Sequence, residues 1–152
     1  MANPAVADYL KFVELQMACE AFLKRNEVPR YTGADLVTAL KEGNLHASKF
    51  TQTGADAFAR HWVVVDQEEN RQSGFSGTLF RCIQDDPATG AKAGELVISF
   101  RSTEFIDDAA RDNQATNTLE IKDHGLAFGQ IADMEDWYAR LVLEGKITDP
   151  NQ

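Results

Sequence analysis

The chain has 152 residues, a length that predicts one domain, and its fractions of hydrophobic and charged residues are ordinary for a globular protein. Its net charge of −9 disfavours nucleic acid as a partner, because phosphates repel an acidic surface. The same charge disfavours electrostatic attachment to anionic lipid. Neutral ester substrates remain compatible with this composition.

Neither a transmembrane segment nor an N-terminal secretory signal is expected. No apolar run approaches the roughly 20 residues that cross a bilayer, and residues 1–10 lack the basic and apolar regions of a signal peptide. The expected localisation is cytoplasmic, or export through a C-terminal signal outside this chain. The two cysteines, Cys19 and Cys82, are too few for a disulfide scaffold and are expected to be reduced structural thiols.

The first 60 residues read as a helical lead-in. Apolar residues recur at helical spacing over 5–25, which predicts a long first helix. A second, short helix is predicted over 33–42, closed by Gly43. One or two further helical turns are expected over 54–60.

The period of the pattern then changes to that of β-strands. A β-branched apolar run predicts a strand over 61–67. Residues 75–83 alternate between apolar and polar, as a half-buried strand does, and 85–94 form a loop. Residues 95–101 are apolar at almost every position, which predicts a central strand buried on both faces.

The last third of the chain begins with an acidic stretch of poor periodicity. A short strand is expected over 118–121. Helical spacing predicts a long helix over 126–144, with Gly145 suited to its C-terminal cap. The order of elements indicates an α/β plan, with a helical lead-in over 1–60 and strands plus a crossover helix over 61–152.

The segment most informative about chemistry is 94–108, where an apolar strand ends abruptly in small and polar residues. In open α/β sheets, functional sites lie at the carboxyl ends of strands. A loop there can direct backbone N–H groups and a hydroxyl at a developing oxyanion, each donor being worth about 3–4 kcal/mol. This segment is therefore the candidate site.

Residues 96–104 resemble the third-strand motif of class 3 lipases and related bacterial lipases, an apolar strand followed by Arg-Gly-Thr or Arg-Gly-Ser. The resemblance implies that Thr103 is the oxyanion-hole residue and that Arg101 is the arginine of the motif. Ser102 stands where the family has glycine, a departure that leaves the following hydroxyl in place.

The resemblance covers about residues 61–145. Residues 74–80 are similar to the preceding strand of bacterial members, and the helix with Asp133 and Trp137 resembles the one before the family's nucleophile strand. The resemblance implies that this chain is the N-terminal portion of a serine lipase or esterase of the α/β-hydrolase class. The implied fold is a set of N-terminal helices followed by the first strands of an α/β-hydrolase-type sheet, which is incomplete.

The family's nucleophile lies in Gly-x-Ser-x-Gly, on a tight turn between a strand and a helix, and this chain has no such motif. The nearest segment has Thr78 at the last glycine position and places Ser76 at the start of a strand, so Ser76 is not expected to be a nucleophile. The catalytic Asp and His follow the serine in this fold, so the three histidines of the chain are not assigned that role. The chain alone is expected to be inactive.

Simpler roles compete with these assignments. Thr103 also fits a turn after a strand, and Arg101 fits a structural ion pair with nearby acids better than substrate binding. The acids that follow lack the spacing and turn glycine of an EF-hand calcium loop, and the histidines and cysteines have no zinc spacing. No metal or cofactor is therefore expected. The acids in question are Glu104, Asp107, Asp108 and Asp112.

Two hypotheses remain from different classes. In the first, the chain is the N-terminal part of a serine lipase or esterase that acts on ester or lipid substrates in the full-length enzyme. In the second, it is a non-catalytic α/β binding or scaffold module. Under the first hypothesis the strand over 95–101 lacks the neighbouring nucleophile strand. Its open edge is then expected to pair with a second copy in a homodimer, to cause aggregation, or to be covered by the C-terminal segment of the chain.

Overall fold

The computed structural model of the protein describes residues 4–44, 49–101 and 127–148. The chain divides into two compact units. The first unit consists of Met1–Gln67 and Thr78–Ser99, and the second of Glu68–Gly77 and Phe100–Gln152. Within the described ranges, no helix has both the length and the apolar character that a bilayer span requires.

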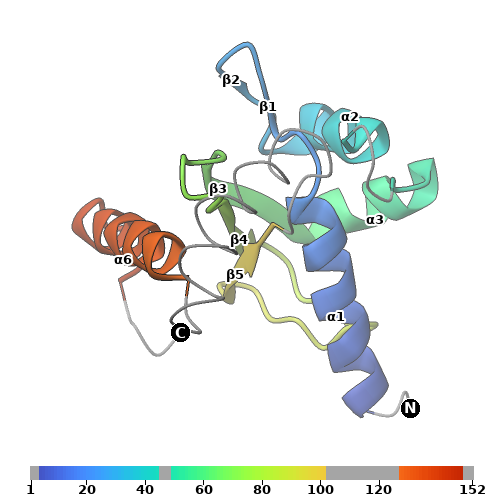
Figure 1. The fold of residues 1–152 in the computed structure, drawn as a ribbon. Helices are drawn as coiled ribbons and strands as arrows, with labels where there is room; N and C mark the ends of the chain where they lie inside the picture. The colour runs from blue at the N-terminus through green and yellow to red at the C-terminus, as the bar shows by residue number, and fades with distance from the viewer. Residues whose placement is uncertain (1–3, 45–48, 102–126, 149–152) are drawn as a thin grey trace. The chain divides into compact units, whose positions relative to one another are not determined.

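Three helices belong to the first unit: α1 (Pro4–Cys19), α2 (Gly33–Glu42) and α3 (Gln52–His61). The prediction of a helix over 33–42 is confirmed, and the turns expected over 54–60 are part of the longer α3. A helix over 5–25 is wrong at its C-terminal end, where α1 stops early. Figure 1 shows α2 and α3 side by side, and the two helices are in contact.

The residues after α1 form a hairpin of β1 (Lys24–Arg25) and β2 (Val28–Pro29). Its two turn residues, Asn26 and Glu27, have φ of 50° and 63°. Left-handed values at both central positions give the turn whose twist matches antiparallel strands. The predicted helix extended to residue 25 because apolar residues continue after α1. Ala21 and Leu23 are buried in the core, but Leu23 O accepts from the Arg30 N–H at 2.8 Å in the hairpin instead of continuing a helix.

The core of the first unit is formed by side chains from its three helices and its strands. The Phe58 ring of α3 meets Phe80 edge-on, with ring centroids 5.8 Å apart, and contacts Phe50 at 5.6 Å. Burial of such large apolar side chains is the main favourable term in the folding of this unit. Its largest buried members are Leu15, Leu23, Leu36, Leu40, Phe58, Trp62 and Phe80.

The larger sheet consists of β3 (Trp62–Glu68), β4 (Gly77–Cys82) and β5 (Leu96–Phe100), in that order. The Cys82 N–H donates to Glu95 O at 2.9 Å at one end of the β4–β5 pair. The Arg101 N–H donates to Ser76 O at 3.1 Å at the other end. Because one residue number falls as the other rises, the pair is antiparallel.

The expected mixture of helices and strands is confirmed, as four helices and small antiparallel sheets in the described residues. The prediction that 95–101 is a central strand buried on both faces is wrong. In the described chain β5 is an outer strand, and Ser99 is its one buried residue. The central strand is β4, in which every residue except Arg81 is buried. This strand was predicted to be half-buried because its glycine and threonine are not strongly apolar, although the structure buries both.

In the described part of the second unit the helix is α6 (Phe128–Leu143), close to its predicted bounds. Gly145 has φ of 68°, and its N–H donates to Val142 O at 3.0 Å. The next N–H, of Lys146, donates to Leu141 O at 2.9 Å. These two bonds satisfy carbonyls that the helix end would otherwise leave open, which confirms the predicted role of Gly145.

Within the second unit, Trp137 of α6 packs against the backbone of Gly77. The Trp137 side chain is fully buried. A Cβ atom at residue 77 would lie 2.8 Å from Cζ3 of the indole, closer than real contacts allow. The Phe75 ring lies beside the same indole, with centroids 5.8 Å apart. Position 77 therefore has to be glycine for the helix to approach this closely.

We predict that Gly77→Ala lowers the free energy of unfolding by about 1–3 kcal/mol, because the added methyl group displaces the Trp137 indole. Alanine would otherwise strengthen a strand relative to glycine. Denaturant unfolding followed by tryptophan fluorescence measures the change. Gly54→Ala in α3 is the matched control, since its closest contact is the Thr51 hydroxyl at 3.3 Å. Equal stabilities for wild type and Gly77→Ala would contradict the packing described here.

Candidate functional site

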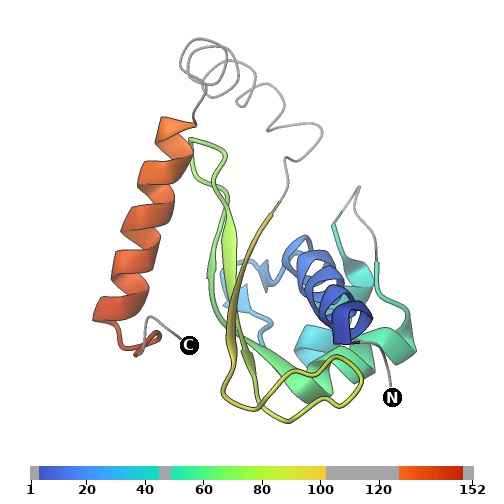
Figure 2. The same ribbon diagram turned by 90° about the horizontal axis from the view of Figure 1, so that it is seen from below.

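The loop that joins β3 to β4 is bound to α6 through the carboxylate of Asp133. Ser73 Oγ donates to Asp133 Oδ2 at 2.5 Å, and Arg71 Nη1 donates to Asp133 Oδ1 at 3.1 Å. Gln130 Nε2 on the same helix donates to the Ser73 carbonyl at 3.2 Å. Figure 2 shows this loop, in green, beside the start of the orange α6. One helix face thus holds the loop by side-chain and backbone contacts.

A second carboxylate, Glu68 at the end of β3, extends this network. It accepts from Arg71 Nε at 2.9 Å and from Arg140 of α6 at 2.8 Å. The hydrogen bond with Glu68 is the largest of the causes that raise the pKa of Arg71, so this guanidinium stays charged. Because Arg71 bridges Glu68 and Asp133, the two carboxylates share a compensating cation.

The loop itself is a tight reverse turn. The Arg71 N–H donates to Phe75 O and the Gly74 N–H donates to Arg71 O, both at 2.9 Å. Gly74 has φ of 86°, a left-handed value that glycine adopts without strain. The Phe75 N–H donates to Ser73 Oγ at 3.1 Å. Ser73 therefore connects the turn's own backbone to Asp133 through a single hydroxyl.

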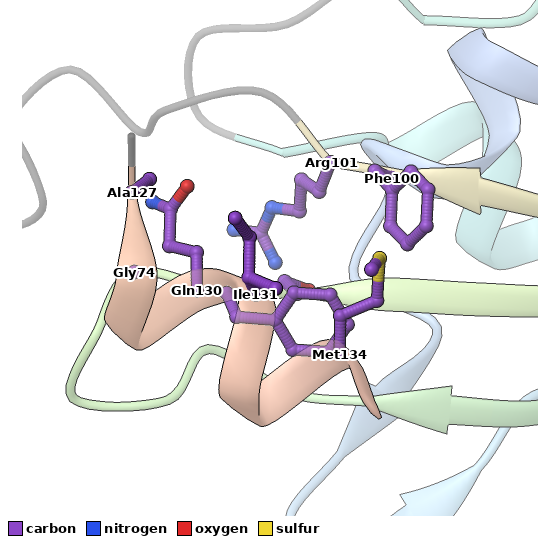
Figure 3. A pocket seen from close by; sticks show the side chains of 9 residues that line it. Gly74, Phe100, Arg101, Ala127, Gln130, Ile131 and Met134 are labelled. Carbon is purple, nitrogen blue, oxygen red and sulfur yellow. The ribbon is translucent and has the colours of Figure 1, made fainter. Parts of the chain in front are cut away.

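A pocket of about 410 Å³ lies within the second unit, between this turn, the end of β5 and α6 (Figure 3). That volume is in the range of small-molecule sites. Its walls come from three segments that are far apart in sequence. The lining residues are Gly74, Phe75, Ser76, Phe100, Arg101, Ala127, Gln130, Ile131 and Met134.

The pocket combines an apolar wall with a few polar groups. Phe75 and Phe100 contact each other with ring centroids 5.9 Å apart, and Ile131 and Met134 continue the apolar surface from α6. Figure 3 shows the Arg101 side chain extending from the end of β5 toward α6. Among the described residues that line the pocket there is no carboxylate. An amphipathic ligand with an apolar body and a polar end suits this lining.

Of the residues singled out from the sequence, Arg101 and Ser76 line this pocket. Thr103 and Ser102 lie outside the described residues, as do the acids from Glu104 to Asp112 and the short strand expected over 118–121. Ser76 lies immediately before β4, as predicted. Its hydroxyl donates to Glu68 O at 2.9 Å, and the residue is buried.

The remaining reactive side chains are separate from the pocket lining. His61 ends α3, and its Nδ1 lies 3.1 Å from Gln84 O. Cys19 and Cys82 are buried thiols that form no disulfide with each other, and burial raises the pKa of the Cys82 thiol. Across the part of the chain that the structure describes, no three His, Cys, Asp or Glu side chains are grouped so as to hold a metal ion.

Sequence reasoning missed Arg71 and Ser73. The Ser73–Asp133 hydrogen bond joins residues 60 positions apart, so no local pattern indicates it. Gly77 and Phe75 pack against Trp137 of α6, a contact that the local pattern around Ser76 does not indicate. Comparison of the chain with protein-family models, curated proteins and solved structures finds no match in any of the three.

We predict that Asp133→Ala destabilises the fold by about 1–3 kcal/mol, because Arg71 and Ser73 lose a partly buried charged acceptor. Thermal or denaturant unfolding measures the loss. Asp136→Ala, at an exposed position on the same helix, controls for helix propensity and net charge and should have little effect. Similar losses for the two variants would show that Asp133 has no special contact with the loop.

Proposed function

We propose that this chain is part of a serine lipase or esterase of the class 3 lipase type and contributes its oxyanion-hole strand. The observation that carries the proposal is the position of Arg101. It follows the last residue of β5, lines the pocket and stands two residues before Thr103. A strand that ends at a partly apolar pocket, with a hydroxyl just beyond, is an arrangement suited to acyl transfer.

In this proposal the residues have distinct roles. Thr103 stabilises the oxyanion that forms when the ester carbonyl is attacked, and the apolar wall of Phe75, Phe100 and Met134 accommodates part of a neutral ester or lipid substrate. The serine nucleophile and its Asp and His partners belong to polypeptide other than residues 1–152, because these residues contain no Gly-x-Ser-x-Gly. The acidic chain has no role in binding nucleic acid.

The sheet is compatible with this assignment in one respect. Antiparallel strands often border the mostly parallel sheets of α/β proteins. The proposal therefore treats β3, β4 and β5 as the first strands of an α/β-hydrolase-type sheet, and the outer edge of β5 as the place for the nucleophile strand.

The test has two arms. The 152-residue chain should neither be labelled by a fluorophosphonate probe nor cleave p-nitrophenyl butyrate above background, because it has no nucleophile elbow. In a polypeptide that joins this chain to a Gly-x-Ser-x-Gly segment encoded by the same gene, Thr103→Val should lower kcat by roughly 10²–10³-fold with little change in stability.

Ser102→Gly is the control for the second arm and should be tolerated, since glycine is the residue of the resembling family. An unchanged kcat in Thr103→Val would reduce Thr103 to a turn residue. Absence of any Gly-x-Ser-x-Gly segment from the gene product would favour the binding or scaffold module. Labelling of the 152-residue chain at Ser76 would overturn the assignment of that serine to a structural role.

Among the strands that the structure describes, none pairs with the outer edge of β5, and this edge leads to a prediction about self-association. The Arg101 N–H donates to Ser76 O, just before β4, so alternate residues of β5 also turn toward β4 and the Ile98 N–H points to the outer edge. Exposed edges of this kind recruit other strands. We therefore predict a homodimer in which β5 pairs across a two-fold axis.

Light scattering over a range of concentrations should show the dimer, and Ile98→Pro should dissociate it, because proline removes an outward donor and leaves the β4 ladder intact. The Ile98 amide should exchange slowly with solvent at high protein concentration and faster on dilution. A monomer at all concentrations would exclude the dimer. If its Ile98 amide were also protected, the sheet edge would be covered without a second copy.

A further inference from the structure

The apolar wall of the pocket in the second unit leaves large side chains partly in water. Phe100 and Ile131 are 44% and 37% exposed, although both belong to the pocket lining. Concave apolar surface that several segments share usually marks a binding site for a small molecule. A ligand with a hydrocarbon part would remove these side chains from water, which is favourable in proportion to the apolar area that it buries.

The charges around the pocket favour a neutral ligand. The described lining contains no carboxylate, so it offers no opposite charge to a cation. Arg101, which also lines the pocket, already has an interaction within the protein, so it is not counted on to neutralise an anion. The net charge of −9 further opposes the binding of anions.

The side-chain amide of Gln130 supplies a hydrogen-bond acceptor. Its Nε2 donates to the Ser73 carbonyl at 3.2 Å, which fixes the way the amide faces. Its Oε1 has no hydrogen bond to any residue that the structure describes, and an amide oxygen can accept two. Figure 3 shows this amide at the end of the pocket where α6 begins, beside Ala127, with Met134 farther along the helix.

The donors of the lining side chains are already in use, which determines the kind of polar group that fits. The Ser76 hydroxyl donates to Glu68 O at 2.9 Å, and Gln130 Nε2 donates to Ser73 O. A ligand group that only accepts hydrogen bonds would therefore face the Gln130 oxygen without a donor between them. A hydroxyl group donates to that oxygen and carries no charge.

We infer that this pocket binds a neutral aliphatic alcohol whose hydroxyl group donates to Gln130 Oε1. The inference does not rest on the proposed hydrolase function. The hydrocarbon chain of the alcohol lies against the apolar wall of Phe75, Phe100, Ile131 and Met134.

The experiment titrates the intact 152-residue chain with octanol, below its solubility limit, and follows amide shifts by NMR. Saturable binding to one site is expected. Heptyl methyl ether has as many non-hydrogen atoms and no donor, and it should bind at least about threefold more weakly. Octanoate should bind at least about tenfold more weakly, because its charge loses water without gaining a counter-ion.

Two results on the wild-type chain would overturn the inference. Shifts that rise with octanol concentration without saturating would show partition onto the surface only. Ether or octanoate binding as tight as that of octanol would refute recognition of a neutral hydroxyl group.

Two variants of α6 test the apolar wall. Affinity should rise by up to about fourfold for each methylene from butanol to octanol, because each one buries more apolar area. Ile131→Trp should abolish binding by filling the pocket. Leu143→Trp, at an 87% exposed position of the same helix, is its control and should bind octanol as the wild type does. Unchanged affinity in folded Ile131→Trp would place the ligand elsewhere.

The hydroxyl contact is tested by Gln130→Leu, which removes the acceptor. This variant should bind octanol and the ether equally, a change that altered packing alone would not produce. Gln72→Leu, at an exposed position of the adjoining turn and outside the lining, should keep the preference for octanol. A preference that persists in Gln130→Leu would refute the contact. Circular dichroism confirms folding, and the wild-type comparison of octanol with the ether decides the inference if a variant does not fold.

The outcome is separable from the proposed hydrolase function. Thr103→Val should leave octanol affinity unchanged, because Thr103 is not among the lining residues that carry the inference. A chain that binds octanol and belongs to no serine hydrolase would refute the proposed function alone. A hydrolase that depends on Thr103 and binds no octanol would refute the alcohol site alone.

Discussion

The packing of the Trp137 indole on the backbone of Gly77 is the contact on which the rest of the second unit depends. Asp133 lies one turn before Trp137, and Arg140 lies one turn after it, so the same helix face brings both to the loop and to Glu68. Were the indole displaced by a side chain at residue 77, these polar contacts would lose their geometry together. The absence of a Cβ atom at one position thus determines how a helix and a turn meet.

The pocket follows from the same arrangement. Its floor is the turn that Asp133 and Ser73 hold, and its apolar wall on α6 is set by Ile131 and Met134, which flank Asp133 in sequence. The carboxylates of the network are paired with Arg71 and Arg140, and Arg101 lines the pocket.

The sequence predicted local features better than tertiary ones. The short helix over 33–42 and the role of Gly145 were correct because caps and helical spacing act over a few residues. The end of α1 was not, because apolar residues that are buried outside any helix, Ala21 and Leu23, continue the pattern after Cys19. The central strand was predicted wrongly. The more hydrophobic sequence is that of β5, whereas the more buried strand in the structure is β4. In the candidate site, the sequence motif indicated Arg101. The pocket that Arg101 lines could not be predicted, because it forms from residues up to 60 positions apart in the sequence.

The contact of Trp137 with Gly77 can be observed directly in solution. In the NMR spectrum of the isotopically labelled chain, the Gly77 Hα protons should show nuclear Overhauser contacts to the Trp137 indole ring and a chemical shift displaced by its ring current, because the ring packs on that backbone. Both signals should disappear in Trp137→Leu. The opposite result is that the wild-type Gly77 Hα protons have ordinary strand shifts and no contact to the indole. That result would contradict the packing of α6 on Gly77 and the formation of the pocket that depends on it.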